Sequence, residues 1–429
     1  MARVLIIGSG GREHAIAQTL TRSSKVDLIL CAPGNAGTSS VAENAGINIH
    51  DHAALVTLAT ERRIDLTIVG PEAPLCSGIV DRFEAEGLHI FGPTAAAARI
   101  EGDKAYAKRL MKRAHVPTAE GRVFERYNEA REYVATRDTG VVVKAAGLAA
   151  GKGVTVCPDP SDALLALEKI MVDQTLGEAG ETVVVEELLQ GPELSIFALV
   201  DGHTIYMLDS AQDHKQIGEG DTGANTGGMG AYSPAPIATR EVLANVERHV
   251  LVPIVDALRG DGAPYRGLLY VGLMLTAAGP KVLEFNCRFG DPEAQVLLAR
   301  LESDLYELLE AVVEGRLDQA EVRWNPKPAV CVVMASQGYP AQYETGKIID
   351  GLDRAGAMSD VQILHSGTKR VGKNIVTSGG RVLGVTALGS DLADARQRAY
   401  AAVETIHFEN AYYRRDIAEK ALSPTQSTS

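Results

Sequence analysis

The first hundred residues alternate between short apolar runs and segments with helical character. The apolar runs occupy 3–7, 26–31, 64–70 and 88–92, and the helical segments follow Gly11, Asp51 and Pro74. Such alternation predicts a parallel sheet with helices on its faces. The loops after the first three strands should lie together at the carboxyl edge of this sheet, where open α/β folds bind ligands. We therefore expect residues 1–102 to form an N-terminal α/β domain that binds substrate.

Two further units are expected in the rest of the 429-residue chain. Strand-like runs lie closer together between 141 and 285, which favours a mixed or antiparallel α+β body over residues 103–324. The segment 216–234 is so rich in glycine that we expect no regular structure there, but a lid or binding loop. A C-terminal α+β domain is expected over 325–424, with strands at 328–336, 361–367 and 381–389 and a helix near Leu392, followed by a frayed tail at 423–429.

The charge and the cysteine pattern exclude several classes of protein. The chain has 42 basic and 55 acidic residues, so its formal charge is -13 and it should repel nucleic acid. No apolar stretch approaches the roughly 18 residues that span a bilayer, and the N-terminus lacks a secretory signal. The five cysteines form no CxxC pair and are typical of reduced thiols. We therefore expect a cytoplasmic protein that binds neither nucleic acid nor membrane; its oligomeric state is left open.

A glycine-rich turn, GSGGREHA at 8–15, follows the first strand and opens a helix. Backbone amides and the helix dipole at such a turn favour an anion, and Gly10 and Gly11 would let a phosphate approach closely. A dinucleotide fingerprint needs glycine or alanine where Glu13 stands, and an acidic residue at the end of the second strand, where the sequence is Cys31-Ala32-Pro33. The pattern therefore disfavours NAD, and a tight turn without any ligand stays an alternative.

A second motif places a lysine on a strand beside a flexible loop. Val141-Val142-Val143-Lys144 is followed by GLAAGKGV at 147–154. A strand lysine next to a glycine loop favours phosphate binding, although the spacing is not that of a P-loop. The alternative for Lys144 alone is a surface lysine at a strand end.

A third motif, TVVVEELLQGPE at 182–193, places three acids around the end of an apolar strand. A purine could lie on this strand, with Glu186 and the backbone at its edge and Glu193 accepting ribose hydroxyls. The alternative is that Glu186, Glu187 and Glu193 are solvated acids in a strand and turn.

The strongest single motif is KVLEFNCRFGDPE at 281–293. Alternate side chains of a strand share a face, so Glu284, Asn286 and Arg288 should project together while Phe285 and Cys287 face the core. A carboxylate and an amide oxygen beside an arginine suit a Mg²⁺ that bridges phosphates. A charged strand face exposed to water is the alternative.

Together these motifs carry a family resemblance. The combination of SGGREHA, PGNAGT, VGPEAPL, GDK at 102–104, KAAGLAAGKGV, QDHK at 212–215, DTGANTGGMGAYSPAP and EFNCRFGDPE closely resembles the glycinamide ribonucleotide synthetases, or phosphoribosylamine-glycine ligases, of the ATP-grasp superfamily. The resemblance extends from Val4 to about Lys420. It implies a central ATP-grasp fold with a small lid subdomain at about 121–192. It also implies a ligase of purine biosynthesis that joins glycine to 5-phosphoribosylamine through a glycyl phosphate made from ATP.

The resemblance further implies roles for individual residues. Catalysis would involve Arg288, which would stabilise the acyl-phosphate transition state, with Asp213 and Lys215. Mg²⁺ or Mn²⁺ would be bound by Glu284 and Asn286. ATP would be held by the loop 149–154, which closes over its phosphates, and by Lys104, Lys144, Gly151, Lys152, Gly153, Glu186, Glu187, Leu189 and Glu193. The other substrates would be held by Gly10, Gly11, Glu72, Gly290 and Asp291.

Two departures from the family pattern concern loop stiffness. Ala146 stands where relatives usually have Asp or Ser, and Ala224 stands where they usually have Pro.

Two rival functions are the alternatives to the ligase. Another ATP-grasp ligase would share the lysines and EFN but should lack QDHK and RFGDPE, and a nucleotide sensor would bind ATP without forming a product.

Overall fold

The N-terminal region folds around a parallel sheet, as the alternating pattern predicts. The structure is a computed structural model that describes residues 1–149 and 151–422. Its first sheet has the order β3-β2-β1-β4-β5, with every pair parallel. The strands are β1 (Ala2–Gly8), β2 (Val26–Pro33), β3 (Glu43–Asn44), β4 (Leu66–Val69) and β5 (Ile90–Phe91). The helices are α1 (Gly11–Leu20), α2 (His52–Glu61), α3 (Glu72–Cys76), α4 (Ile79–Ala85) and α5 (Ala95–Gly102).

Local sequence explains where these helices start and stop. The Asp51 side chain accepts a hydrogen bond from the Ala54 amide at 3.0 Å and caps α2, which satisfies an amide that the helix leaves unpaired. The helix expected after Pro74 instead begins at Glu72 and is interrupted by Gly78, which has a left-handed backbone with φ of 87°. This glycine divides one predicted helix into α3 and α4.

A second sheet lies at the centre of the molecule and is antiparallel, in the order β11-β10-β16-β17. Alternate residues of β10 enter two different cores: Ile196 belongs to one and Phe197 to the other. The strands are β10 (Glu193–Asp201), β11 (Ile205–Met207), β16 (Arg266–Thr276) and β17 (Gly279–Asn286). The surrounding helices are α6 (Lys104–Arg113), α9 (Arg240–Val246), α10 (Val252–Gly260), α11 (Glu293–Arg300) and α12 (Leu305–Glu314).

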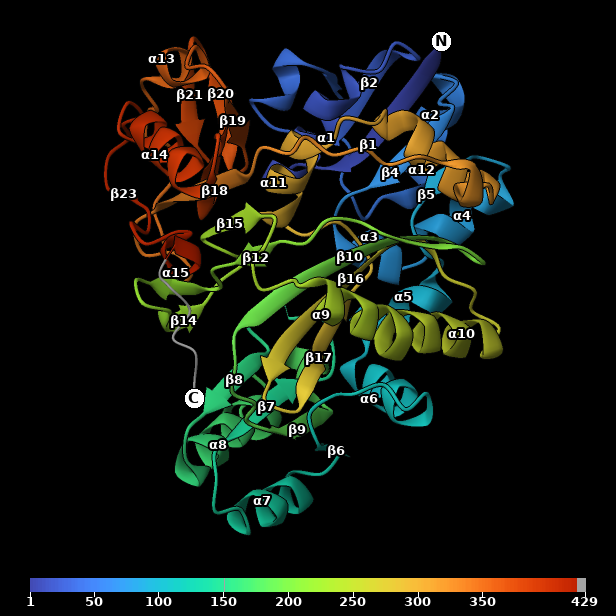
Figure 1. The fold of residues 1–429 in the computed structure, drawn as a ribbon, viewed down its shortest axis with the longest axis vertical. Helices are drawn as coiled ribbons and strands as arrows, with labels where there is room; N and C mark the ends of the chain where they lie inside the picture. Colours follow the sequence, from blue (N-terminus) through green and yellow to red (C-terminus); the bar gives the residue numbers. More distant parts are fainter. Residues whose placement is uncertain (150, 423–429) are drawn as a thin grey trace.

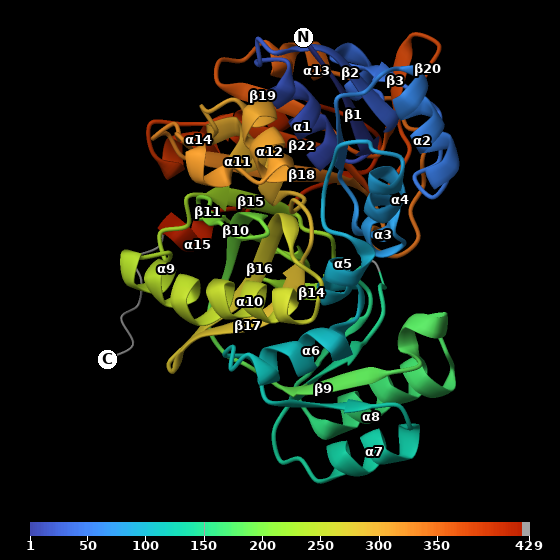
Figure 2. The same ribbon diagram turned by 90° about the vertical axis from the view of Figure 1, so that its right-hand side faces the viewer.

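A third sheet forms a separate layer at the far end from the N-terminal sheet (Figures 1 and 2). It is antiparallel in the order β6-β9-β7-β8 and packs against two helices. Its elements are β6 (Gly121–Phe124), α7 (Tyr127–Ala135), β7 (Val141–Ala145), β8 (Val154–Cys157), α8 (Pro160–Leu167) and β9 (Val183–Glu187). These elements occupy most of the segment expected to form a small lid.

The C-terminal sheet includes two strands from the middle of the chain, β12 and β15. Its order is β12-β15-β18-β22-β19, and β23 also pairs with β18. The C-terminal elements are β18 (Ala329–Ser336), α13 (Leu352–Gly356), β19 (Val361–His365), β20 (Thr368–Val371), β21 (Asn374–Thr377), β22 (Arg381–Leu388), α14 (Leu392–Val403), β23 (Ala411–Tyr412) and α15 (Glu419–Leu422). The sheet and helix expected here are confirmed. The predicted tail at 423–429 lies outside the described residues.

The expectation that 216–234 lacks regular structure was wrong. β12 (Gln212–Asp213) precedes a hairpin of β13 (Gln216–Gly218) and β14 (Thr222–Asn225), and β15 (Gly230–Ser233) pairs with β18. A Cβ atom at Gly230 would lie 2.7 Å from the Cys331 carbonyl oxygen and 2.8 Å from Ile417, so close approach explains this glycine. No helix within the described ranges is long and apolar enough to cross a membrane.

Candidate active site

The end of β17 carries three polar side chains that project together. Glu284 and Asn286 alternate with Phe285 and Cys287, which are only 2% and 1% exposed. Arg288 follows the strand, and its Nη2 donates to Asn286 Oδ1 at 3.3 Å. The strand therefore presents a carboxylate, an amide and a guanidinium on one side, as the alternation of the sequence predicts.

Arg288 is held between two acids of the N-terminal region. Its Nε lies 3.2 Å from Glu72 Oε2 and its Nη2 lies 3.3 Å from Glu101 Oε1. Glu101 also accepts a hydrogen bond from the Cys287 amide at 2.6 Å. Burial opposes the charge on Glu72, but Arg288 and Arg12 lower the pKa of this carboxyl below its usual value. The guanidinium is thus fixed by Asn286 of β17 and by two acids of the N-terminal region.

Lysines from two elements meet one buried glutamate. Glu186, on β9, is 4% exposed; Lys108 Nζ lies 2.5 Å from its Oε1 and Lys144 Nζ lies 2.7 Å from its Oε2. Lys144 also donates to the Leu283 carbonyl at 3.0 Å, which joins the third sheet to β17. Lys104, one turn before Lys108 on α6, donates to the Gly147 carbonyl at 3.1 Å. Lys108 is not among the predicted site residues, although its i,i+4 spacing from Lys104 is a signal that places both on one helix face.

Lys215 links two acids across the site. Its Nζ lies 2.8 Å from Glu193 Oε2 and 3.7 Å from Glu284 Oε1. Burial opposes ionisation of Glu284, but Lys215, Lys144 and Lys104 lower its pKa below the usual value. The Glu284 side chain is 35% exposed, so its ionised carboxylate stays accessible among cations.

Asp213 is the most perturbed carboxyl near the site. It is 6% exposed, and burial raises its pKa to about 8, with Glu293 and Glu193 adding to the effect and Lys215 and Lys420 opposing it. Asp213 is therefore mostly protonated at neutral pH. A carboxyl held in this state can donate a proton or a hydrogen bond, and such perturbed groups cluster at functional sites.

The shifted pKa of Asp213 predicts a pH-dependent cost to stability. Because the folded-state pKa lies above the ordinary value of 3.8, the stability that this group contributes is present below about pH 4 and is lost as the pH rises through about 8. We expect Asp213→Asn to match wild type in melting temperature near pH 4 and to exceed it by about 2 °C or more at pH 8.5. Thermal scans across this range test it; parallel curves for the two proteins would contradict the predicted pKa.

The predicted phosphate turn is already crowded by side chains. The Gly10 amide donates to Glu13, whose carboxylate caps α1. A Cβ atom at Gly10 would lie 3.2 Å from Asp291 Oδ2, and one at Gly11 would lie 2.7 Å from both Gln295 Nε2 and Ser366 Oγ. Only part of this turn is thus open to a ligand, and a side chain at Gly11 would collide with α11 and the C-terminal region.

Glu13 also fills the place that a dinucleotide would need. A Cβ atom at Gly70 would lie 1.9 Å from Glu13 Oε1, so this side chain packs across the ends of β1 and β4. We expect NADH to show no micromolar binding to the protein, whereas ADP and ATP bind. Titration with NADH while following nicotinamide fluorescence checks this. Micromolar NADH binding that ATP displaces would contradict it.

Asp291 and Gly290 connect the central and C-terminal regions. Gly290 packs so tightly that a Cβ atom would lie 2.4 Å from Glu293 Oε2. Arg381, on β22, donates through Nη1 to the Asp291 and Gly227 carbonyls at 2.6 Å each, and its Nη2 lies 3.3 Å from Asp291 Oδ2. Arg381 is not among the predicted site residues, because nothing in its local sequence pattern indicates a partner some 90 residues away.

The remaining predicted nucleotide residues lie along the third sheet. Glu187 already has protein partners: its Oε1 accepts from Lys281 Nζ at 2.7 Å and from the Glu120 amide at 2.9 Å. Leu189 is half-buried just after β9. Gly151 has a left-handed φ of 79°, Lys152 is exposed and Gly153 is buried. The predicted loop 149–154 includes residue 150, which lies outside the described residues.

The donor set at Glu284 and Asn286 fits a hard divalent cation. Within residues 1–149 and 151–422, no group of three or more His, Cys, Asp or Glu side chains has the arrangement of a metal site. The two oxygens alone suit Mg²⁺, which commonly keeps water and takes phosphate oxygens beside one or two protein ligands. The accessible, ionised Glu284 makes this fit possible.

Comparisons with known proteins agree along the whole chain. Models of the phosphoribosylglycinamide synthetase N domain, ATP-grasp (A) domain and C domain match residues 2–101, 102–294 and 329–420. The chain belongs to the phosphoribosylglycinamide synthetase family. A phosphoribosylamine-glycine ligase of Rhodopirellula baltica is 50% identical over 98% of both chains, and one of Vibrio cholerae is 47% identical over 99% of this chain and all of its own.

Solved structures support the same family and show a similar fold in a second kind of enzyme. The crystal structure of phosphoribosylamine-glycine ligase from Thermotoga maritima matches with a TM-score of 0.83 at 33% identity, over 97% of this chain and 100% of the other. A biotin carboxylase from Campylobacter jejuni matches with a TM-score of 0.74 at 14% identity, over 99% of this chain and 96% of the other. The second likeness shows that the synthetase family shares its fold with biotin carboxylase. Membership of the family confirms the predicted three-part architecture with an ATP-grasp centre.

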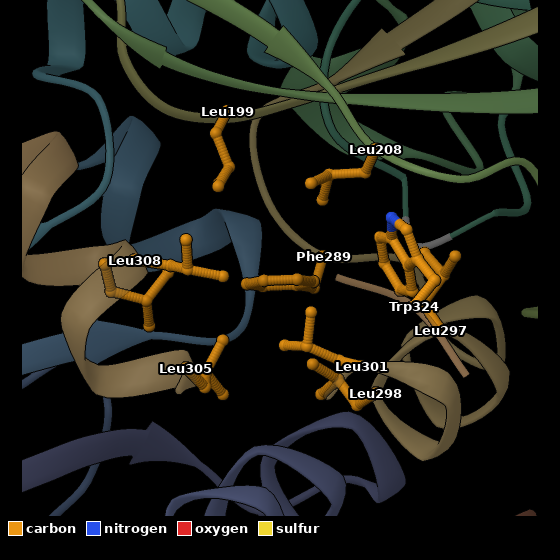
Figure 3. Close-up of a pocket in the computed structure, with 10 residues that line it drawn as sticks. Leu199, Leu208, Phe289, Leu297, Leu298, Leu301, Leu305, Leu308 and Trp324 are labelled. Atoms are coloured by element: carbon orange, nitrogen blue, oxygen red, sulfur yellow. The ribbon is translucent and has the colours of Figure 1, made fainter. Parts of the chain in front are cut away.

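This synthetase fold contains a small apolar cavity (Figure 3). Its volume is about 10 Å³, and Phe289, directly after Arg288, forms one wall. The other lining residues are Leu199, Leu208, Leu297, Leu298, Leu301, Leu305, Leu308, Leu309 and Trp324. A void lined by apolar atoms offers water no hydrogen-bond partners, so it is a packing defect and not a substrate site.

Proposed function

We propose that this protein joins glycine to 5-phosphoribosylamine at the expense of ATP, giving glycinamide ribonucleotide, ADP and phosphate. The observation that carries the proposal is a cluster of cations, Lys104, Lys144, Lys215 and Arg288, gathered around the ionised Glu284 at the end of β17. Relatives that carry the name of this ligase cover nearly the whole chain. The reaction belongs to purine biosynthesis.

The cations suit a reaction that moves a phosphoryl group. A carboxylate is a poor electrophile, so glycine must first be phosphorylated before the amine of phosphoribosylamine can attack it. Lys104 and Lys144 bind the ATP phosphates, and Arg288 neutralises the charge that develops during transfer. Because Arg288 is already held by Glu72 and Glu101, it needs little reorganisation to act.

Glu284 and Asn286 hold Mg²⁺ or Mn²⁺ in this proposal. The cation, when bound, neutralises phosphate charge and orients the transferred group. Glu284 stays ionised for this purpose because the neighbouring lysines lower its pKa.

The adenosine is held along β9 and the start of β10. Glu186 and the backbone near Leu189 meet the adenine, Glu187 lies beside it, and Glu193 accepts the ribose hydroxyls. Gly151, Lys152 and Gly153 belong to a loop that closes over the phosphates. Closure protects the acyl phosphate from water.

The second face of the site holds glycine and phosphoribosylamine. Residues from the N-terminal edge and from the loop after β17 approach each other there: Gly10, Gly11, Glu72, Gly290 and Asp291. Asp213 and Lys215 lie beside them on and after β12, where a protonated carboxyl and an ammonium can position the reacting groups and move protons.

The test is phosphate release from ATP with glycine and freshly made phosphoribosylamine. Each substrate is omitted in turn, and glycinamide ribonucleotide is identified by mass. We expect release to require all three substrates. ATP binding without any product would indicate a nucleotide sensor, and release with a different carboxylate would indicate another ATP-grasp ligase.

A further inference from the structure

The last described segment of the chain runs alongside the segment that carries Asp213 and Lys215. Residues 412–420 and residues 213–221 are joined by hydrogen bonds along their whole length. The pairs are Tyr412 Oη to the Ile217 carbonyl (2.7 Å), Arg414 Nη1 to the Gln216 carbonyl (2.9 Å), the Arg415 amide to Glu219 Oε1 (3.1 Å), the Gly220 amide to Asp416 Oδ2 (2.8 Å), the Ala418 amide to His214 Nε2 (3.1 Å) and Lys420 Nζ to the Asp213 carbonyl (3.1 Å).

A buried arginine anchors this contact. Arg414 is 0% exposed, and its guanidinium donates to Asp221 Oδ1 at 2.8 Å and to Asp416 Oδ2 at 2.6 Å. A buried charge is tolerated only when it is paired and hydrogen-bonded, so these two acids hold Arg414 in one place. Since Asp221 lies in the β13–β14 turn and Asp416 in the C-terminal segment, the arginine ties the two segments together.

His214 also takes part in the contact between residues 213–221 and residues 412–420. Its Nε2 accepts from the Ala418 amide, so this nitrogen carries no proton, and its Nδ1 faces Asp221 Oδ1 at 3.6 Å. The ring is 1% exposed, and burial is the main reason why its pKa is lowered to about 4. The imidazole is neutral and fixed, and its neighbours in sequence are Asp213 and Lys215.

The segment is also held by residues 226–230. The His214 amide donates to the Gly230 carbonyl at 2.9 Å, the Met229 amide to the His214 carbonyl at 2.8 Å and the Thr226 amide to the Lys215 carbonyl at 2.8 Å. β12 has only two residues and lies at the edge of its sheet, where it pairs with β15 alone among the named strands. The β13–β14 hairpin forms a separate two-stranded unit. A two-residue strand has few ladder hydrogen bonds, so the bonds from Ala418 and Lys420 add to those from residues 226–230 in fixing the backbone at 213–215.

We infer that residues 412–420 form a strap that aims Asp213 and Lys215 into the site, with Lys420 as its positioning residue. This inference rests on the proposed ligase function. Lys420 is the best probe, because it bonds the Asp213 backbone directly while its side chain remains 33% exposed. Its removal therefore leaves no buried charge unpaired, unlike removal of Arg414.

The experiment compares Lys420→Met, Lys420→Arg and the control Lys347→Met in the full chain. Lys347 is a matched lysine of the C-terminal region that pairs with Glu344 and Glu409 at 3.1 and 3.0 Å, away from the strap. We expect Lys420→Met to lower kcat by about tenfold or more, as misplacement of reacting groups does. The apparent KM for ATP, the stoichiometry of ATP binding by calorimetry and the melting temperature should stay near wild type. Lys420→Arg, which keeps a cation at this position, should turn over nearly as fast as wild type, and Lys347→Met should behave as wild type.

Amide hydrogen exchange gives a readout that does not depend on the reaction. Peptides covering 212–221 should exchange faster in Lys420→Met than in wild type or Lys347→Met. Unchanged exchange in these peptides, wild-type kcat in Lys420→Met, or failure of arginine to restore turnover would overturn the strap. Absence of substrate-dependent phosphate release from the wild-type protein would overturn the proposed function instead, and the exchange comparison would still decide whether the strap holds this segment.

Discussion

Turnover is expected to fall about a thousandfold when Glu284 is replaced by glutamine. The substitution keeps the size of the side chain and removes the only ionised group that we assign to the metal. It also removes the acid that Lys215, Lys144 and Lys104 face together. Because the side chain is 35% exposed, the melting temperature should change little. Steady-state phosphate release at increasing Mg²⁺ concentration, with thermal scans, measures both effects.

A matched control separates the metal role from general loss of an ion pair. Glu310, on α12, has a 26% exposed side chain paired with Arg316 at 2.7 Å, so Glu310→Gln removes a comparable interaction elsewhere. This variant should keep wild-type turnover. Near-normal activity of Glu284→Gln at saturating Mg²⁺ would rule out the metal role.

Arg288→Lys is expected to lower kcat by about a hundredfold or more, with ATP affinity within a few-fold of wild type. Lysine keeps the positive charge but lacks the planar fork that reaches Glu72, Glu101 and Asn286 together. The charge would then no longer be aimed at the transferred phosphoryl group. Presteady-state phosphate release and calorimetry with ATP distinguish a slower chemical step from weaker binding.

The control for this change is Arg316→Lys. Arg316 also contacts two carboxylates, those of Glu310 and Glu314, but on α12 and its following turn. It should retain normal kinetics. If Arg288→Lys bound ATP far more weakly and then turned over normally at saturation, Arg288 would be a nucleotide ligand and not a stabiliser of the transition state.

The fold was largely predictable where periodicity is local. The parallel sheet of β1, β2, β4 and β5 follows from apolar runs that are buried on both faces, and the antiparallel central strands follow from their close spacing. The glycine content of 216–234 predicts no strands, but low strand propensity does not exclude strands that pair with distant parts of the chain. In β15, Gly230 is required for close packing against β18, which lies about 100 residues later in the chain.

The site residues also divide into those that the local sequence places and those that only the tertiary structure brings together. Strand alternation places Glu284 and Asn286 on one side of β17, with Arg288 just beyond, and helical spacing places Lys104 and Lys108 on one face of α6. The contacts of Arg381 with Asp291 and of Arg414 with Asp221 join residues separated by long stretches of chain. No local pattern encodes such pairs, since either arginine on its own is indistinguishable from a solvated surface residue.

Sequence alone determined the family and the three-part order of the chain, and it predicted most of the groups that we propose to bind phosphate and metal, because each depends on residues close together along the chain. Tertiary structure decided that Glu13 fills the glycine turn, that burial raises the pKa of Asp213 to about 8 and that residues 412–420 hold the segment bearing Asp213 and Lys215. These properties arise from desolvation and from contacts between distant segments. Both exist only once the sheets have packed against one another.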